Sequence, residues 1–583
     1  MMPPTTLNQG FSLTVIEGGL TIIAIVLAFG WPRLASTYFS HIEHSLRPLA
    51  QKQGLAVAVV GLTELLSRLA LLPLFPIPLP FVPDDFSFLL AADTFASGRL
   101  ANPTPAMWPH FESIHITMQP TYMSMYFPAQ GLVLAAGKIL FGQSWFGVLL
   151  VNSLMCAAIC WMLQAWLPPT WALLGGMIAI LRLGLFSYWI NTYSGGGALT
   201  ALGGALVLGA LPRFMRSVHL RDALLLAIGI ILLATTRPYE GMLLCLPVAG
   251  WLSYWIFFAK TRPSAAKLIR CASLPLVLIF AAGYWMAYYD YRAFGNPLTL
   301  PYTVNRATYA MAPYYVWQSP RPQPVYHHEV LKRFYYHNEL EGFQAIHTLA
   351  GFVPQTCIKV IRVFLFFAGP ALLIPVFVLR RAVMDRRIRF LVVSVLVLSA
   401  GMLIEIFLIP HYLGPFTSAF YAIGLQAMRH LRLWNLGGQR VGLALVRFSV
   451  TLCVGMAALR LFSGPLHIVI PKWPASDWSG FWYGPEHFGE ERNRVENRLE
   501  HLPGRQLVIV RYAPDHNSLD EWVYNAADID NSKVIWAREM DAAENLKLMH
   551  YYGDRHVWLV QPDQQQVSAT PYPIPEQISV ASQ

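Results

Sequence analysis

"FVPDDFSFLLAADTFASG" (residues 81–98) places two adjacent carboxylates, Asp84 and Asp85, directly after a strongly apolar stretch. Pro83 and the two acids suit the first turn of a helix, and Gly98 suits its end. The sequence therefore predicts that a helix opens on an acidic pair just where a membrane span finishes.

This helix, predicted from Asp85 to Ser97, has an amphipathic pattern. Its apolar side would rest on lipid or protein, and Ser87 and Thr94 would face water, as in a helix lying on a membrane surface. In one interpretation Asp84 caps the helix and Asp85 favours its dipole. That interpretation explains one acid better than two, so a functional role for the pair stays open beside it.

The composition is that of a membrane protein. Of the 583 residues, 55% are hydrophobic and 13% are charged, against roughly 25% charged in soluble proteins. The net charge of +10 comes from short basic clusters between apolar runs, which is typical of cytoplasmic loops and predicts no nucleic-acid partner. The six cysteines form no disulfide framework or zinc pattern. The first eleven residues carry no Lys or Arg, so no cleavable signal peptide is expected.

The predicted fold is a polytopic all-α membrane domain with a small outer C-terminal α/β domain. A span requires about 20 apolar residues, and the chain offers about twelve. They lie near 12–30, 54–76, 144–166, 171–190, 197–213, 221–236, 241–259, 272–291, 359–379, 389–409, 412–430 and 442–463. The segment 128–141 is too short for a span and is predicted to be a half-helix at the outer surface.

Five basic clusters fall on alternate connections, so a single topology makes all of them cytoplasmic. Their members are Arg33, Arg47 and Lys52; Arg213, Arg216 and Arg221; Lys260, Arg262, Lys267 and Arg270; Arg380, Arg381, Arg386, Arg387 and Arg389; and Arg429, Arg432 and Arg440. This predicts a multi-pass membrane protein with both termini outside the cytoplasm, and the resemblance to bacterial proteins described below implies a bacterial inner membrane. The chain then divides into a transmembrane domain (1–463), which includes outer loops 77–143 and 292–358, an extracytoplasmic domain (464–563) and a disordered tail (564–583).

The extracytoplasmic domain is predicted to hold a partly parallel sheet. Its strands are expected at 505–512, 533–539 and 555–561, with helices near 488–501, 518–528 and 541–551. Inside the spans, Glu64 and Arg68 are expected to pair at i,i+4. Arg182 and Glu405 have no obvious partner and should face protein or a watery cavity. The run "SGGGALTALGG" (194–204) is interpreted as close helix packing.

Several strings, taken in order, carry a resemblance. The acidic pair is followed by "PTYMSMYFPAQG" (120–131), by "ILFG" (139–142) and by "SWFGVLLVNSLMCAAICWML" (144–163), and "HYLGPFTSAFYAIGLQ" (411–426) comes late in the chain. This order resembles the GT-C glycosyltransferases, which include aminoarabinose and protein O-mannosyl transferases and are distantly related to oligosaccharyltransferases. Over nearly the whole chain, "LLAADTFA", "RPYEG" and "EWVYNAADID" also resemble bacterial membrane proteins of unassigned activity.

The resemblance implies a glycosyltransferase with a polyprenyl-phosphate sugar donor, a lipid bilayer around it, and a glycan, lipid or protein acceptor. It implies Asp84 as the general base and Asp85 as a supporting acid. The substrate-binding candidates lie in or near the matching strings: Arg237, Tyr239, Glu240, His411, Tyr412, Tyr126, Gln130 and Lys138. Arg237 would grip the donor phosphate or pair with Glu240. No cofactor is certain, and a divalent metal is left open. A transporter or flippase of lipid-linked substrates and a non-catalytic assembly protein are the alternative functions.

Overall fold

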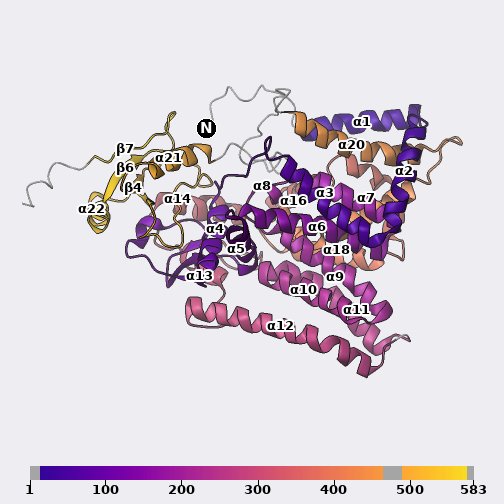
Figure 1. The fold of residues 1–583 in the computed structure, drawn as a ribbon, viewed down its shortest axis with the longest axis horizontal. Helices are drawn as coiled ribbons and strands as arrows, with labels where there is room; N and C mark the ends of the chain where they lie inside the picture. Colours follow the sequence, from indigo (N-terminus) through magenta and orange to yellow (C-terminus); the bar gives the residue numbers. More distant parts are fainter. Residues whose placement is uncertain (1–12, 261, 464–488, 574–583) are drawn as a thin grey trace, which may run out of the picture.

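The computed structural model describes residues 13–260, 262–463 and 489–573 of the chain. Figure 1 shows long helices stacked side by side over one half of the molecule. A small sheet with two short helices lies at the opposite end, and the helices α4, α5 and α13 lie between these two parts.

The helices of the bundle follow the predicted spans. They are α1 (Leu13–Gly30), α3 (Gln53–Ala70), α6 (Trp145–Trp166), α7 (Pro169–Ala179), α9 (Gly197–Ser217), α10 (Leu220–Thr236), α11 (Pro238–Phe258), α12 (Ala265–Phe294), α16 (Leu349–Phe367), α18 (Arg389–Leu403), α19 (Thr417–Leu431) and α20 (Val441–Ser463). Within the described ranges, seven helices are long and apolar enough to cross a membrane: α3, α6, α9, α11, α12, α16 and α20. Each predicted span coincides with helical structure, and the number of crossings stays a prediction.

Shorter elements connect or interrupt these helices. They are α2 (Ser36–Gln51), a π turn (Ile180–Gly184), α8 (Tyr188–Asn191), a 3₁₀ segment (Ala371–Val378), α17 (Leu379–Val383) and a 3₁₀ segment η6 (Pro410–Phe416). In the predicted outer loop after α12 come α13 (Pro301–Tyr309), α14 (Glu329–Lys332), a π segment η4 (Arg333–Leu340) and α15 (Glu341–Ile346). The predicted span 171–190 is therefore a broken helix, and η6 carries the predicted site residues His411 and Tyr412.

Glycines bring α9 close to its neighbours. A methyl group on Gly203 would lie 3.1 Å from the backbone oxygen of Gly229 in α10, and one on Gly204 would collide with the backbone of Pro415 in η6. The interpretation of this glycine run as a close-packing surface is confirmed for its helical part.

Two expectations for charges inside the bundle change. Glu64 accepts hydrogen bonds from Asn152 and Ser153, while Arg68 donates to Asn191 and to backbone oxygens, so the two residues contact different partners. Arg182 has a partner that its own sequence neighbourhood does not reveal. Its Nη1 lies 3.1 Å from Oε1 of Glu17 in α1, and both side chains are buried. Because the two residues are 165 positions apart, only the tertiary structure pairs them.

The helix of the opening stretch is α4 (Pro83–Ala96), and it is not amphipathic. Its buried side chains lie on every side and include Ser87 and Thr94, which were expected to face water. Strand β3 (Thr121–Ser124), α5 (Pro128–Phe141) and the C-terminal region pack around it. Ser87 donates to the backbone oxygen of His115, and Thr94 to that of Leu90, so both hydroxyls are satisfied away from water.

A three-stranded antiparallel sheet covers one side of α4. Strand β3 lies between β1 (Asn102–Pro103) and β2 (Ile116–Thr117), with Asn102 opposite Tyr122 and Ile116 opposite Ser124. A 3₁₀ turn (Trp108–Phe111) connects β1 to β2. The short helix predicted at 128–141 is α5, and it packs on both α4 and α6.

The C-terminal region holds a four-stranded sheet in the order β5-β4-β6-β7. The predicted strands are confirmed as β4 (Arg505–Val510), β5 (Val534–Arg538) and β6 (Arg555–Val560), and both pairs with β4 are parallel. Helices α21 (Glu490–Glu500) and α22 (Ala542–Tyr551) match two predicted helices. Residues 464–488, at the start of the predicted domain, lie outside the described residues.

Two expectations in this region are wrong. The stretch 518–528 is not helical, because tertiary contacts hold its backbone open: Trp522 accepts from Arg492, and Asn525 from Tyr122. The predicted disordered tail is described as far as residue 573, and strand β7 (Thr570–Pro571) pairs there with β6. Residues 574–583 lie outside the described part.

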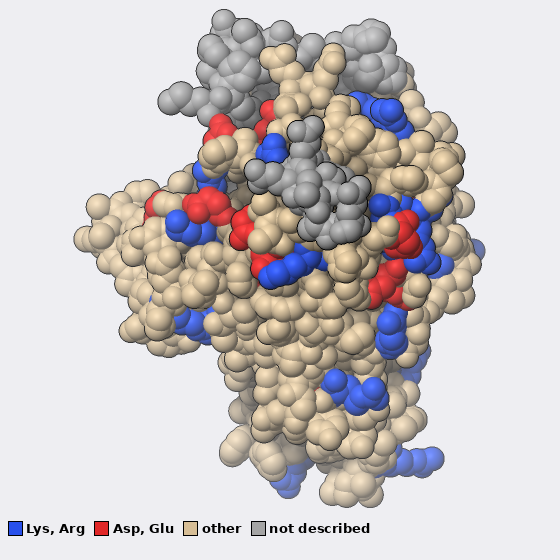
Figure 2. All heavy atoms as spheres, turned by 90° about the vertical axis from the view of Figure 1, so that its left-hand side faces the viewer, with Lys and Arg blue, Asp and Glu red and all other residues tan. Residues whose placement is uncertain are grey.

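The end of the molecule formed by this sheet and the outer loops carries charges of both signs. Figure 2 shows acidic and basic side chains intermixed over the upper part of this face, above a largely uncharged lower part.

Candidate active site

Asp84 lies at an accessible point where two other side chains hold one of its oxygens. Its Oδ1 is 2.9 Å from Nδ1 of His115 and also accepts a hydrogen bond from the Tyr126 hydroxyl. The Tyr126 hydroxyl is 3.1 Å from the same His115 nitrogen. The Asp84 side chain is 35% exposed, and its Oδ2 makes no hydrogen bond to a described residue. The arrangement leaves a fixed carboxylate with one oxygen available.

Asp84 is not the helix cap. Val82 occupies the N-cap position of α4, makes no side-chain cap, and is followed by Pro83 in the first turn. Proline at the start of a helix sets the backbone without needing a side-chain cap. The capping interpretation of Asp84 is therefore wrong, because its carboxylate contacts His115 and Tyr126 instead.

Asp85 points into the protein and is completely buried. Its Oδ1 accepts a hydrogen bond of 3.0 Å from the backbone nitrogen of Tyr193. Burial raises the pKa of Asp85 to about 7, and the nearby charge of Asp84 also raises it. With no exposed surface, Asp85 contacts the protein interior, and its expected role as a supporting acid stays a prediction. Its contact positions the backbone at Tyr193.

Arg237 lies between α10 and α11, with a partner on each side of its guanidinium. Its Nη1 is 3.0 Å from Oε1 of Glu240, and its Nε donates to the backbone oxygen of Gly195 at 3.3 Å. Its Cζ lies 4.0 Å from the ring centre of Tyr412, in a cation–π contact. Nη2 donates to no described residue, so one edge of the guanidinium remains available although the side chain is only 11% exposed.

The loop "NTYSGGG" (191–197) contacts both Asp85, the neighbour of Asp84, and Arg237. The residues around Asp84 (His115 and Tyr126) are called the Asp84 group, and those around Arg237 (Glu240 and Tyr412) the Arg237 group. At Tyr193 its backbone nitrogen contacts Asp85 and its backbone oxygen accepts from Gln130 at 3.1 Å. At Gly195 its backbone oxygen accepts from Arg237. The His411 ring also packs against Gly195. Four predicted side chains from separate parts of the sequence therefore contact this loop: Asp85, Gln130, Arg237 and His411.

Gly195 requires the absence of a side chain. Its φ is +79°, and a methyl group there would lie 2.9 Å from the His411 ring. The His411 backbone nitrogen donates to the Tyr188 hydroxyl, which in turn lies 2.8 Å from His411 Nδ1. These two contacts hold both the backbone and the ring of His411 against Tyr188. Burial and the Arg237 charge hold the pKa of His411 well below its usual value.

Tyr302 of α13 lies between the Asp84 group and the Arg237 group. Its ring centre is 5.5 Å from that of Tyr126 and 6.1 Å from that of Tyr314. Arg237 and Tyr412 are among its electrostatic neighbours. Its hydroxyl makes no hydrogen bond to a described residue. Tyr302 is therefore a neighbour of both Tyr126, which contacts Asp84, and Arg237.

Two predicted residues lie elsewhere. Lys138 pairs with Asp93 of α4, with Nζ 2.5 Å from Oδ1, and within the described ranges this acid is its ion-pair partner. Tyr239 donates to the backbone oxygen of Gly401 at 2.9 Å and packs on Tyr315. Both contacts are structural, and neither residue joins the two groups.

Sequence reasoning missed His115, Tyr193, Gly195 and Tyr302. Three consecutive glycines at the outer end of a predicted span could have indicated this loop. On the sequence alone they are interpreted only as close helix packing. His115 and Tyr302 lie in long loops rich in His and Tyr, where nothing local distinguishes them. Within the described residues no three His, Cys, Asp or Glu side chains are grouped so that they could hold a metal ion.

No protein-family model and no curated protein sequence matches the chain. Among solved structures, ArnT from Cupriavidus metallidurans in the apo state is similar at 13% identity and a TM-score of 0.48, over 87% of this chain and 94% of that one. The same protein bound to undecaprenyl phosphate gives 13% identity and a TM-score of 0.43, over 87% and 93%. The Archaeoglobus fulgidus oligosaccharyltransferase tethered with an acceptor peptide gives 10% identity and a TM-score of 0.41, over 79% and 62%. Similarity at this level assigns no activity to this chain.

Proposed function

We propose that this protein is an integral-membrane glycosyltransferase that moves a sugar from a polyprenyl-phosphate donor to an acceptor on the extracytoplasmic face. The main supporting observation is that loop 191–197 contacts both Asp85 and Arg237. Asp84, next to Asp85, is an accessible carboxylate, and Arg237 is a cation with one available edge. Sugar transfer from a phosphate needs a base for the acceptor and a cation for the leaving group.

Arg237 is the proposed phosphate contact. Glu240 and the Tyr412 ring fix the plane of the guanidinium, and a fixed planar guanidinium matches phosphate oxygens better than a flexible ammonium does. As the bond between sugar and phosphate breaks, charge grows on the phosphate oxygens, where a positioned cation stabilises the transition state.

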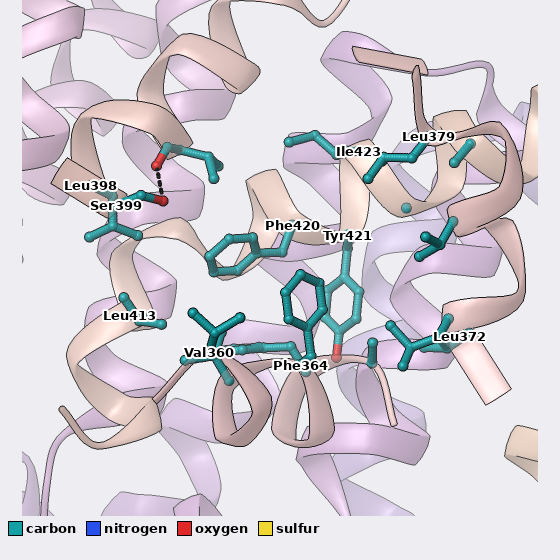
Figure 3. Close-up of a pocket in the computed structure, with 18 of the residues that line it drawn as sticks. Val360, Phe364, Leu372, Leu379, Leu398, Ser399, Leu413, Phe420, Tyr421 and Ile423 are labelled. Carbon is teal, nitrogen blue, oxygen red and sulfur yellow. Dashed lines mark hydrogen bonds between the residues drawn. The ribbon is translucent and has the colours of Figure 1, made fainter. Parts of the chain in front are cut away.

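An apolar cavity formed in part by the segment that follows Tyr412 suits the donor's lipid tail. It has a volume of about 500 Å³ and is lined by α16, α18, α19 and η6, among other segments. Figure 3 shows Phe364, Phe420 and Tyr421 extending into this space. Leu413 of η6 lines the cavity next to Tyr412, the residue under Arg237. The proposed phosphate contact and the proposed site for the hydrocarbon chain thus share the segment η6.

Asp84 is the proposed general base. Its Oδ2 accepts the proton of the acceptor hydroxyl or amine while that nucleophile bonds to the anomeric carbon. The bond between this carbon and the phosphate oxygen breaks, and the polyprenyl phosphate leaves with the electron pair. Help of this kind is typically worth about 10²- to 10⁴-fold.

Asp84→Asn tests the base. Because Asn keeps an oxygen for Tyr126 but cannot take a proton, we expect a folded protein whose sugar transfer is about 10²-fold slower or worse. Turnover is measured as consumption of the lipid-linked sugar that accumulates in a deletion strain. The control is Asp93→Asn on the same helix, which breaks the pair with Lys138 and should retain activity. Near wild-type turnover of Asp84→Asn would contradict the assignment of Asp84 as the general base.

Arg237 variants test the phosphate contact. Arg237→Lys loses the planar fork and Arg237→Ala loses the charge, so donor affinity should fall in that order. Binding of undecaprenyl phosphate to the purified protein is the measurement. Arg292→Ala is the control, since that arginine is a predicted outer-side cation that donates a hydrogen bond to Tyr288 of its own helix. Equal affinity of wild type and Arg237→Ala would exclude this residue.

A further inference from the structure

His115 has a backbone conformation that histidine rarely adopts. Its φ is +63°, and only two other non-glycine residues in the described ranges, Ala35 and Val218, have positive φ. A side chain in this left-handed region is sterically disfavoured. Such residues persist where the surrounding structure fixes them, and they are common at functional sites.

The surroundings of His115 fix both its backbone and its ring. Its backbone oxygen accepts from the Ser87 hydroxyl at 2.6 Å and from the Met125 nitrogen at 3.1 Å. Its ring lies between those of Tyr126 and Phe334, with centres 5.7 and 5.4 Å away. The side chain is 13% exposed. These contacts hold the imidazole ring so that Nδ1 points towards Asp84.

We propose that His115 is the positioning residue for Asp84, holding Oδ1 so that Oδ2 faces the acceptor. The inference rests on the proposed function and adds a residue to its site. With a proton on Nδ1, the imidazole donates to Oδ1 at 2.9 Å, and Tyr126 donates to the same atom. Two donors on one oxygen stop the carboxylate from rotating. A base must lie in line with the proton that it accepts, so rotation would slow the reaction step rather than weaken donor binding.

Two substitutions distinguish the effect of the Nδ1 hydrogen-bond donor from the effect of the backbone conformation at His115. His115→Gly suits the positive φ but removes the donor. His115→Asn places an amide nitrogen near the position of Nδ1, and Asn tolerates this backbone region better than most residues. His556→Asn, at an exposed position of β6, is the matched control and should behave like wild type.

The expected result is a split between kinetic constants. His115→Gly should lower kcat by about 10- to 100-fold and leave the donor KM unchanged within about twofold, because the Arg237 group is intact. His115→Asn should recover most of the lost kcat. A wild-type kcat for His115→Gly, or equal impairment of the Gly and Asn variants, would overturn the inference. If His115→Gly does not fold, the kcat of His115→Asn against that of His115→Ala decides in the same way.

A second measurement separates this inference from the proposed function. Thermal unfolding of His115→Ala, Asp84→Asn and the double variant forms a cycle that needs no activity. Coupled effects on the midpoint support the contact, and additive effects overturn it. Undecaprenyl phosphate binding and sugar turnover by the wild type test the proposed function. Their absence together with coupled unfolding would reject the glycosyltransferase and keep His115 as the partner of Asp84.

Discussion

Asp84 and Asp85 are neighbours in sequence with opposite surroundings. Successive residues on a helix point about 100° apart, so one carboxylate reaches the accessible cluster with His115 while the other enters the protein beside Tyr193. Burial raises the pKa of Asp85 to about 7 from 3.8. The two acids therefore differ in position: Asp84 is accessible, and Asp85 is buried against the backbone of a loop.

Asp85→Asn should change how stability depends on pH. The folded pKa of Asp85 is raised above the unfolded value, so the folded state holds a proton that the unfolded state loses between pH 3.8 and about 7. The free energy of unfolding of the wild type then falls as pH rises through that window, by ~1.4 kcal/mol for each unit of pKa shift. The amide has no such proton. The midpoint of thermal unfolding of Asp85→Asn, relative to wild type, should therefore rise from about pH 5 to about pH 8. A constant difference would contradict the raised pKa.

The loop 191–197 is the element on which the site depends. Its contacts are mostly through the backbone: Tyr193 to Asp85 and Gln130, and Gly195 to Arg237. Backbone contacts leave little trace in side-chain identity. The visible trace is the glycines, because Gly195 needs both a positive φ and room for the His411 ring.

Gly195→Ala compared with Gly98→Ala tests that element. Both glycines have positive φ, but a methyl group on Gly98 meets no atom within 4 Å, while one on Gly195 meets the His411 ring. Each substitution should cost about 1–2 kcal/mol of stability from the left-handed backbone. Gly195→Ala should cost more and should also weaken undecaprenyl phosphate binding, since His411 and Arg237 must shift. Equal effects of the two variants on unfolding and on binding would show that His411 adjusts freely.

Over the whole molecule, the C-terminal region is fastened to the outer loops. Arg538 of β5 donates to the backbone oxygen of Glu112, and Tyr524 donates to Asp93 of α4. Tyr122 of β3 donates to the backbone oxygen of Asn525. These contacts put the sheet on the same side as Asp84 and fit the sidedness that the basic clusters predict.

A topology reporter checks that side. A fluorescent protein that matures only in the cytoplasm, fused after Pro573, should stay dark. The fusion point follows β7, which belongs to the sheet. The same reporter fused to a chain truncated after Arg386, in a predicted cytoplasmic connection, should fluoresce. Fluorescence from the Pro573 fusion would reverse the orientation and move Asp84 to the cytoplasmic face.

The sequence by itself determined the elements whose signal is local. Apolar runs placed a helix at every predicted span, and alternating patterns placed β4, β5 and β6. The same patterns failed where partners distant in sequence decide. Helix α4 looked amphipathic because Ser87 and Thr94 are polar, yet β3, α5 and the C-terminal region bury it.

Only the tertiary structure decided the membership of the site. The sequence singled out Asp85, Gln130, Arg237 and His411 as separate candidates, and folding brought their side chains to one loop whose glycines the sequence pattern assigns to helix packing. Folding also gave Asp84 and Asp85 different surroundings. It added His115, which contacts Asp84 from a backbone position with positive φ. The physical reason is that hydrogen bonds and desolvation act over a few ångströms in space, and that distance is not encoded in the spacing of residues along the chain.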